Sequence, residues 1–199
     1  IKDNIMILVF SDLHINETAQ FSKINVNGFT TRQEEAIQVA KDVLSVLQNP
    51  KYKFDALVFA GDLFNPVGNQ VSVSNMATAE KIITILQEEC IKQDIIFYLL
   101  VGNHDNACAS LTGFHKLVPF KHYDHVRVID SMEEIDNMVF MPYLYDDVMA
   151  NNFLENISDK SNKIVFSHLE IKDYELGNGI KTTKGASIEY LSQIKEIER

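Results

Sequence analysis

Seven polar side chains follow four apolar runs of the sequence, at the point where each run ends. The four segments are "SDLH" (11–14), "GDLF" (61–64), "GNHD" (102–105) and "SHLE" (167–170), and their chemically useful members are Asp12, His14, Asp62, Asn103, His104, Asp105 and His168. Carboxylate, amide oxygen and imidazole together suit a divalent transition metal such as Mn, Fe, Co or Zn better than Ca or Mg, which prefer oxygen ligands. The spacing therefore predicts a site for one or two metal ions.

Each motif taken alone has a simpler interpretation. A D-x-H or G-D sequence at a strand end is usually a turn or a helix cap, in which the Asp bonds its own backbone. The "GNHD" segment fits a tight turn that uses Gly102 and Asn103, and a lone His168 is more often a hydrogen-bonded core residue than a ligand. The metal interpretation depends on all four motifs meeting at one sheet edge. His115, His122 and His125 follow no such strand end, and we predict surface or packing positions for them.

The elements that must position these residues alternate along the chain. Short apolar runs, typical of strands covered on both faces, predict strands over 5–10, 56–60, 95–101, 137–143 and 163–167. Apolar residues at helical spacing predict helices over 31–48, 74–90, 146–156 and from about residue 187. Thr31 and Glu34 fit a capping box at the start of the first helix. The pattern predicts an α/β fold with helices outside a largely parallel sheet, which binds ligands at the carboxyl ends of its strands.

Composition limits the alternatives. A chain of 199 residues with 46% hydrophobic residues can bury the core of a single domain, which we expect to span 1–199. Eighteen basic against 28 acidic residues give a net charge of −10, which argues against a broad basic surface for nucleic acid. The two cysteines indicate neither a disulfide framework nor a metal pair, so a reducing compartment is expected. No apolar run approaches the roughly 18 residues that span a bilayer, and the first residues do not resemble a signal peptide.

The ordered series D-x-H, G-D, G-N-H-D and a His after a strand resembles the calcineurin-like metallophosphoesterases, which are two-metal phosphoester hydrolases. Within that family, "GDLF", "VGNHD", the "MPY" strand and "SHLE" are most similar to the SbcD-type nuclease subunit, particularly its tailed-phage relatives. The resemblance covers residues 5 to about 190. It implies an α/β metallophosphoesterase fold, in which a β-sandwich core is flanked by α-helices.

The resemblance also implies roles for the seven residues. Asp12 and His14 would bind one ion, Asp62 would bridge both, and Asn103 with His168 would bind the other. The expected cofactor is a pair of divalent ions, Mn²⁺ first among them.

His104 is implied to be a catalytic residue and not a ligand. It would act as general acid toward the leaving oxygen or stabilise developing charge, with Asp105 orienting its ring. A neutral or protonated imidazole is suited to this task near pH 7, and a neighbouring carboxylate can fix its tautomer.

One family motif has no counterpart here. The family closes its site with G-H-x-H, whose imidazoles complete the two metals, but none of the 31 residues after His168 is a histidine. Either the sequence stops before that motif or the protein is a metal-poor member. The segment 187–199 resembles a helix without a C-cap glycine or proline. We therefore expect a domain truncated before its last metal-binding motif.

The resemblance implies DNA as the substrate and an SbcC-like SMC-type ATPase as the partner, with the chain acting as a homodimer in the cytoplasm, that of the host if the gene is phage-encoded. Bound metal ions would supply positive charge where the acidic chain lacks it. The long polar loop 16–33 is expected to contact substrate, and the candidate phosphate contacts are Lys23, Arg32, Lys181 and Lys184. Two other functions stay open: a phosphatase or small-molecule phosphodiesterase of the same superfamily, and a non-catalytic scaffold.

Overall fold

Four short strands form a parallel sheet in the computed structural model, in the order β1-β2-β3-β4. They are β1 (Ile7–Phe10), β2 (Ala56–Phe59), β3 (Ile96–Leu100) and β4 (Val126–Ile129). The structure describes residues 5–17, 22–65, 70–106, 114–143, 147–160, 163–175 and 179–192. Because the strands are parallel, their carboxyl ends lie along one edge of the sheet.

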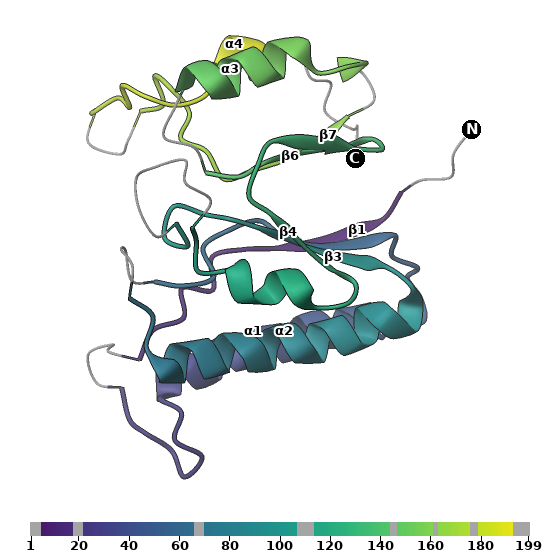
Figure 1. Ribbon diagram of the computed structural model, residues 1–199, viewed down its shortest axis with the longest axis vertical. Coiled ribbons are helices and arrows are strands. Elements are labelled where there is room, and N and C mark those ends of the chain that lie inside the picture. Colours follow the sequence, from purple (N-terminus) through teal and green to yellow (C-terminus); the bar gives the residue numbers. More distant parts are fainter. Residues whose placement is uncertain are drawn as a thin grey trace.

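A second sheet packs on the first. It has the order β5-β6-β7, with β5 antiparallel and β7 parallel to β6, and its strands are β5 (Glu133–Ile135), β6 (Met138–Met141) and β7 (Ile164–Ser167). Figure 1 shows the two sheets as adjacent layers with helices on both outer sides. The expected sandwich flanked by helices is therefore confirmed.

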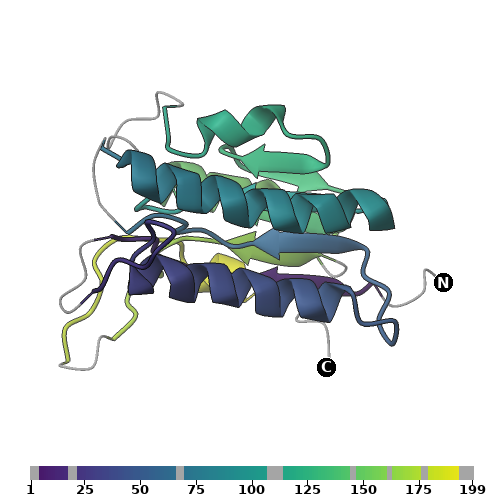
Figure 2. The same cartoon turned by 90° about the horizontal axis from the view of Figure 1, so that it is seen from below.

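Two long helices cover the outer face of the first sheet, α1 (Thr31–Leu47) and α2 (Val73–Gln93). They lie beneath the strands in Figure 1 and run side by side across the face of the sheet in Figure 2, which looks at the molecule from below. The second sheet is covered by α3 (Asp147–Asn156), with the short α4 (Ile188–Leu191) beside it. None of the described helices is long and apolar enough to cross a membrane.

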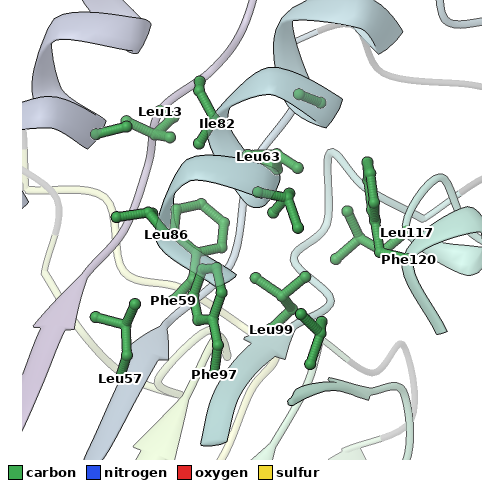
Figure 3. Packing of buried hydrophobic residues seen from close by; sticks show 14 of the residues in the cluster. Leu13, Leu57, Phe59, Leu63, Ile82, Leu86, Phe97, Leu99, Leu117 and Phe120 are labelled. Carbon is green, nitrogen blue, oxygen red and sulfur yellow. The ribbon is translucent and has the colours of Figure 1, made fainter. Parts of the chain in front are cut away.

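The continuous apolar runs are explained by burial on both faces of each strand. Successive side chains of a strand point to opposite faces, so in β2 Leu57 and Phe59 pack toward α1 and α2, while Ala56 and Val58 pack toward the second sheet. Figure 3 shows how the helix side of this core is filled, with Phe59 and Phe97 beneath Leu86 of α2. The strand ends that carry the polar motifs are thus anchored in a well-packed interior.

Some local expectations differ from the structure. The cap of α1 lies one residue earlier than expected: the Thr30 side chain accepts from Gln33 N, and the Gln33 side chain accepts from Thr30 N, so Thr31 and Glu34 are not the capping pair. Helix α2 extends three residues beyond the expected end, to a left-handed cap at Asp94. The strands β4 and β5 and a 3₁₀ turn, η1 (Val118–His122), fall in a stretch for which no element was expected.

The end of β4 carries a further polar group, Asp130. Its carboxylate accepts from Nε2 of His115 at 3.1 Å and from Nζ of Lys121. His115 is buried, whereas His122 is exposed and His125 half-buried, in agreement with the surface or packing positions expected for them. Partial burial opposes ionisation of Asp130, but the bonds from Lys121 and His115 outweigh it, so the pKa of this carboxyl is lowered.

This arrangement predicts an acid-sensitive contribution to stability. A carboxyl whose pKa is lower in the folded chain stabilises the fold above its unfolded pKa, and this contribution is lost as the pH falls through the folded value. Urea unfolding followed from pH 7 to below 3.8, the ordinary pKa of the group, should show the free energy of unfolding declining less steeply in Asp130→Asn than in the wild type. Equal slopes would contradict the role given to this contact.

Candidate metal centre

The first two motifs meet where β1 and β2 end, and their backbone is unusual. Asp12, His14 and Asp62 all adopt left-handed conformations, with φ of 57°, 45° and 62°. The two segments are joined by backbone bonds, from Asp12 N to Gly61 O at 3.0 Å and from His14 N to Asp62 O at 3.1 Å. Left-handed residues other than glycine are costly and cluster at functional sites. Three of the expected ligands are therefore held in left-handed conformations at these two strand ends.

Asp62 lies at the centre of the converging side chains and is only 4% exposed. Its Oδ2 faces Nε2 of His14 at 3.8 Å and Nε2 of His104 at 4.0 Å. Its Oδ1 faces Nε2 of His168 at 3.4 Å. The two carboxylate oxygens thus face two different groups of donors, as a carboxylate that bridges two ions must.

Each oxygen of Asp62 has a further candidate ligand beside it. On the Oδ2 side, Oδ1 of Asp12 lies 3.5 Å from Nε2 of His14. On the Oδ1 side, Oδ1 of Asn103 lies 3.0 Å from Nε2 of His168. All five expected ligands therefore meet at one edge of the sandwich, in the two groups that the resemblance implies.

The hydrogen bonds of His168 show which nitrogen is available. Its Nδ1 donates to the carbonyl oxygen of Ala60 at 2.9 Å, and a carbonyl can only accept. In the neutral ring Nε2 then carries a lone pair, although it faces the oxygens of Asp62 and Asn103. Three acceptors in contact need a cation between them, either a proton or a metal ion.

The charge balance of the metal-free chain agrees with this geometry. Burial disfavours the charged form of His168, but its bonds to Asp62 and Ala60 outweigh burial and raise the pKa of the imidazole. Burial likewise disfavours ionised Asp62, yet the bond from His168 and the backbone bond from His104 lower the pKa of the carboxyl. The site therefore attracts positive charge to the space between these side chains.

Two glycines leave room for this arrangement. A Cβ at Gly61, which has φ of 107°, would lie 2.3 Å from Nδ1 of His168. A Cβ at Gly102 would lie 2.1 Å from Oδ1 of Asp62. The glycines of "GDLF" and "GNHD" are thus required because side chains of the centre pack directly against them.

His104 points its ring toward the same space. Its Nδ1 donates to the carbonyl oxygen of Asn65, which leaves Nε2 facing Asp62 and the ring of His14, 5.0 Å away between centroids. Its backbone N–H donates to Oδ1 of Asp62 at 3.0 Å. The ring orientation is therefore set by the carbonyl of Asn65, a residue that no sequence motif indicated.

The expectation that Asp105 orients the His104 ring is wrong. Asp105 is fully buried, and its carboxylate accepts backbone N–H groups of two loops, at distances of 2.9 to 3.2 Å; the donors are Asp62, Leu63, Phe64 and Gly102. Complete burial raises the pKa of this carboxyl, while the backbone bonds oppose the shift. Asp105 thus joins the "GDLF" and "GNHD" loops and positions the ligands through the backbone.

The donor set fits a transition-metal ion. Two ligands about 2.1 Å from a tetrahedral ion lie roughly 3.4 Å apart, and the distances around Asp62 are of this size. Among the described residues, His14, Asp62 and His104 offer ligand atoms that all lie within 4.8 Å of one another. Nδ1 of His14 is buried without a hydrogen-bond partner in the described structure. No competing bond therefore holds this ring, and an ion at Nε2 would fix it.

A sandwich of two sheets with such a donor set at its strand ends fits a metal-dependent hydrolase. The family model for calcineurin-like phosphoesterases matches residues 5–199. The chain therefore belongs to the calcineurin-like phosphoesterase family. A search of curated proteins finds no match.

The expected phosphate contacts are not brought to the centre as a group. Arg32 pairs with Glu35 on α1 at 2.9 Å, and Lys23, Lys181 and Lys184 are exposed. Within the loop 16–33, residues 18–21 lie outside the described part of the chain, as do 193–199 of the expected last helix. The sequence motifs thus predicted the side chains that converge on the centre but none of the groups that support them.

Proposed function

We propose that this chain is the nuclease domain of a DNA-cleaving complex and that it binds two divalent ions, preferably Mn²⁺. The observation that carries the proposal is the position of Asp62, whose two oxygens face separate groups of imidazole and oxygen donors. The choice of DNA among phosphoesters is supported by the similarity of "VGNHD", "MPY" and "SHLE" to SbcD-type nucleases. The five expected ligands and His104 have the roles described next.

Asp12 and His14 would hold one ion, Asn103 and His168 would hold the other, and Asp62 would be shared. When bound, the ions would supply positive charge that polarises the phosphoryl group and stabilises the attacking and leaving oxygens of an in-line displacement. His104 remains outside the ligand set. Its Nδ1 proton is held by the carbonyl of Asn65, so Nε2 is the nitrogen that carries the second proton of the imidazolium form and gives it to the leaving oxygen, leaving the neutral ring.

The exposure of these side chains favours a substrate that approaches from the surface. The side chain of Asp12 is 55% exposed, that of His14 30% and that of His104 25%, whereas the side chain of Asp62 is 5% exposed. The centre is open on the side of Asp12 and His104 and closed beneath Asp62. A backbone phosphate of a polymer can reach such a centre without entering a deep pocket.

The acidic character of the chain supports a partner that provides the grip on DNA. The net charge is −10, and a chain of this charge attracts a polyanion poorly. We propose that an SbcC-like ATPase supplies the basic surface, that the nuclease acts as a homodimer and that the complex works in the cytoplasm. Co-purification of the two proteins and their joint stimulation of cleavage would test this part.

The function is tested by Mn²⁺-dependent cleavage of linear duplex DNA, compared with hydrolysis of p-nitrophenyl phosphate. We expect the protein to cut DNA and His104→Ala to reduce kcat by roughly 100- to 10,000-fold, the usual size of general acid catalysis. Mn²⁺ affinity should stay within about twofold of the wild type, because His104 is not a ligand. His122→Ala, a change at an exposed histidine, is the matched control and should retain activity.

Each other outcome removes a defined part of the proposal. Hydrolysis of the small monoester without DNA cleavage would replace the nuclease with a phosphatase. Inactivity on both substrates despite bound Mn²⁺ would favour a non-catalytic scaffold. A large loss of Mn²⁺ affinity in His104→Ala would make this residue a ligand.

A further inference from the structure

Lys116 is a buried cation outside the motifs, and it lies directly behind His104. It is 6% exposed, and its Nζ donates to the carbonyl oxygen of His104 at 2.8 Å. Its own backbone N–H donates to the carbonyl oxygen of Asp105, also at 2.8 Å. An antiparallel bridge between Asn106 and His115 places this segment beside the end of the "GNHD" loop. The ammonium group is thus held under the peptide that carries the imidazole.

A buried lysine needs a reason, because removing its charge from water is costly. Burial lowers the pKa of the Lys116 ammonium, and the negative charges of Asp105 and Asp62 act in the opposite direction. These are the carboxylates that join the two loops and bridge the two groups of ligands. Lys116 therefore compensates the negative charge of the centre from its protein side.

His104 is consequently held at three points. Its N–H donates to Oδ1 of Asp62 at 3.0 Å, its ring Nδ1 donates to the carbonyl of Asn65, and its carbonyl accepts from Lys116. Two of these contacts come from the "GDLF" strand end and its loop. The contact with Lys116 comes from the segment bridged to the end of the "GNHD" loop, so it attaches the His104 peptide to a further part of the chain.

We propose that Lys116 is a positioning residue for His104, holding the imidazole over the metal centre through the His104 carbonyl. This inference rests on the proposed function, since it assigns His104 a proton transfer in phosphodiester hydrolysis. The bond from its ammonium group ends on the His104 carbonyl oxygen, which is not one of the expected ligand atoms. Its removal should therefore impair the step that His104 performs and spare metal binding.

The test is Lys116→Met, which removes the charge and the donor and keeps the length of the side chain. Its matched control is Lys163→Met. The Lys163 side chain is 10% exposed, and its Nζ donates to the backbone carbonyl oxygen of Asp136 at 2.7 Å. Lys163 precedes β7, at the end of the strand opposite His168. Both variants lose an ammonium group that donates to a backbone carbonyl. Lys163 is half-buried and also pairs with Glu134 at 3.1 Å, whereas Lys116 is buried and bonds the His104 carbonyl.

We expect Lys116→Met to lower kcat by about 10- to 100-fold with KM unchanged, the usual cost of a small misplacement of a catalytic group. The loss should be large for a diester with a poor alcohol leaving group and small for bis-p-nitrophenyl phosphate, whose leaving group needs little protonation. In a His104→Ala background, Lys116→Met should change kcat by less than about twofold. Lys163→Met should show none of these effects.

A readout independent of activity separates this inference from the function on which it rests. In the metal-free protein, the imidazole nitrogen signals of His104 in a histidine-labelled NMR spectrum should shift in Lys116→Met and stay unchanged in Lys163→Met. Mn²⁺ affinity should remain within about twofold in both variants. If the wild type hydrolyses no diester, the proposed function fails, and the NMR comparison still decides the position of His104.

Several results would overturn the positioning role. They are a wild-type kcat in Lys116→Met, an equal loss for good and poor leaving groups, a full additional loss in the His104→Ala background, or unchanged His104 signals. Should Lys116→Met not fold, Lys116→Gln keeps a shorter neutral donor and carries the same set of measurements.

Discussion

Replacing Asp62 with asparagine should abolish Mn²⁺ binding and hydrolysis together. Both oxygens of this carboxylate face imidazole nitrogens, so its charge is shared by both halves of the centre. Mutating an outer partner of a metal ligand already costs about 10- to 100-fold in affinity, so losing the shared ligand should cost more than about 100-fold. Isothermal titration with Mn²⁺ measures this directly.

Asp130→Asn is the matched control for this variant. Asp130 also follows the carboxyl end of a strand of this sheet, so the variant makes the same chemical change in a similar position. The Asp130 carboxylate contacts His115 and Lys121 and none of the expected ligands among the described contacts. The Mn²⁺ affinity of this variant should equal that of the wild type. An affinity of Asp62→Asn within tenfold of the wild type would refute the bridging position of Asp62.

Adding one methyl group at Gly102 should have an effect of similar size, for a steric reason. The Cβ of Gly102→Ala would lie 2.1 Å from Oδ1 and 2.4 Å from the backbone nitrogen of Asp62. Gly102 is not among the residues with positive φ, so alanine suits its backbone and the collision alone decides the outcome. Overpacking of this kind costs roughly 1–3 kcal/mol or more, and it displaces the shared ligand.

We therefore expect Gly102→Ala to lower the free energy of unfolding by about 3 kcal/mol and to bind no measurable Mn²⁺. Urea unfolding and Mn²⁺ titration measure the two effects. Gly28→Ala is the control that distinguishes a steric collision from backbone strain. Gly28 has a φ of 82°, which strains an alanine, but no heavy atom lies within 4 Å of the added Cβ. That variant should lose some stability and keep its metal affinity. Wild-type behaviour of Gly102→Ala would contradict the close packing described here.

The parts of the fold that the sequence predicts are those whose pattern is continuous. Strands such as β2 are buried on both faces and appear as uninterrupted apolar runs. In β4 the run is broken by the exposed Arg127, and β5 has only three residues, two of them acidic. The pairing of β4 with β3 joins residues that lie about 29 positions apart, as Phe97 and Val126 do, so no local pattern reveals it. The strand β5 pairs with the adjacent β6 across a short turn, but it is too short and too polar to show an apolar pattern.

Within the site, too, the residues that follow a regular sequence pattern could be predicted and the others could not. The expected ligands follow strand ends, and the parallel sheet brings strand ends together, so their convergence could be predicted. Asp105 was predicted to orient the ring of its sequence neighbour His104. In a tight turn adjacent side chains point in different directions, and the Asp105 carboxylate accepts instead from backbone amides some 40 residues earlier in the chain. Asn65 and Lys116 act through backbone carbonyls, which any sequence contains, and therefore carry no motif.

The four backbone amides that donate to Asp105 affect how the centre binds metal ions. One carboxylate closes the chain between residues 62 and 105, as a covalent cross-link would, and it does so without any metal. The entropy of bringing these two segments together is therefore lost during folding and not during ion capture. Incoming ions encounter a coordination sphere whose backbone is already rigid. Metal uptake should then proceed with little change in hydrogen exchange outside the ligand loops, unlike that of small domains that fold around their ion.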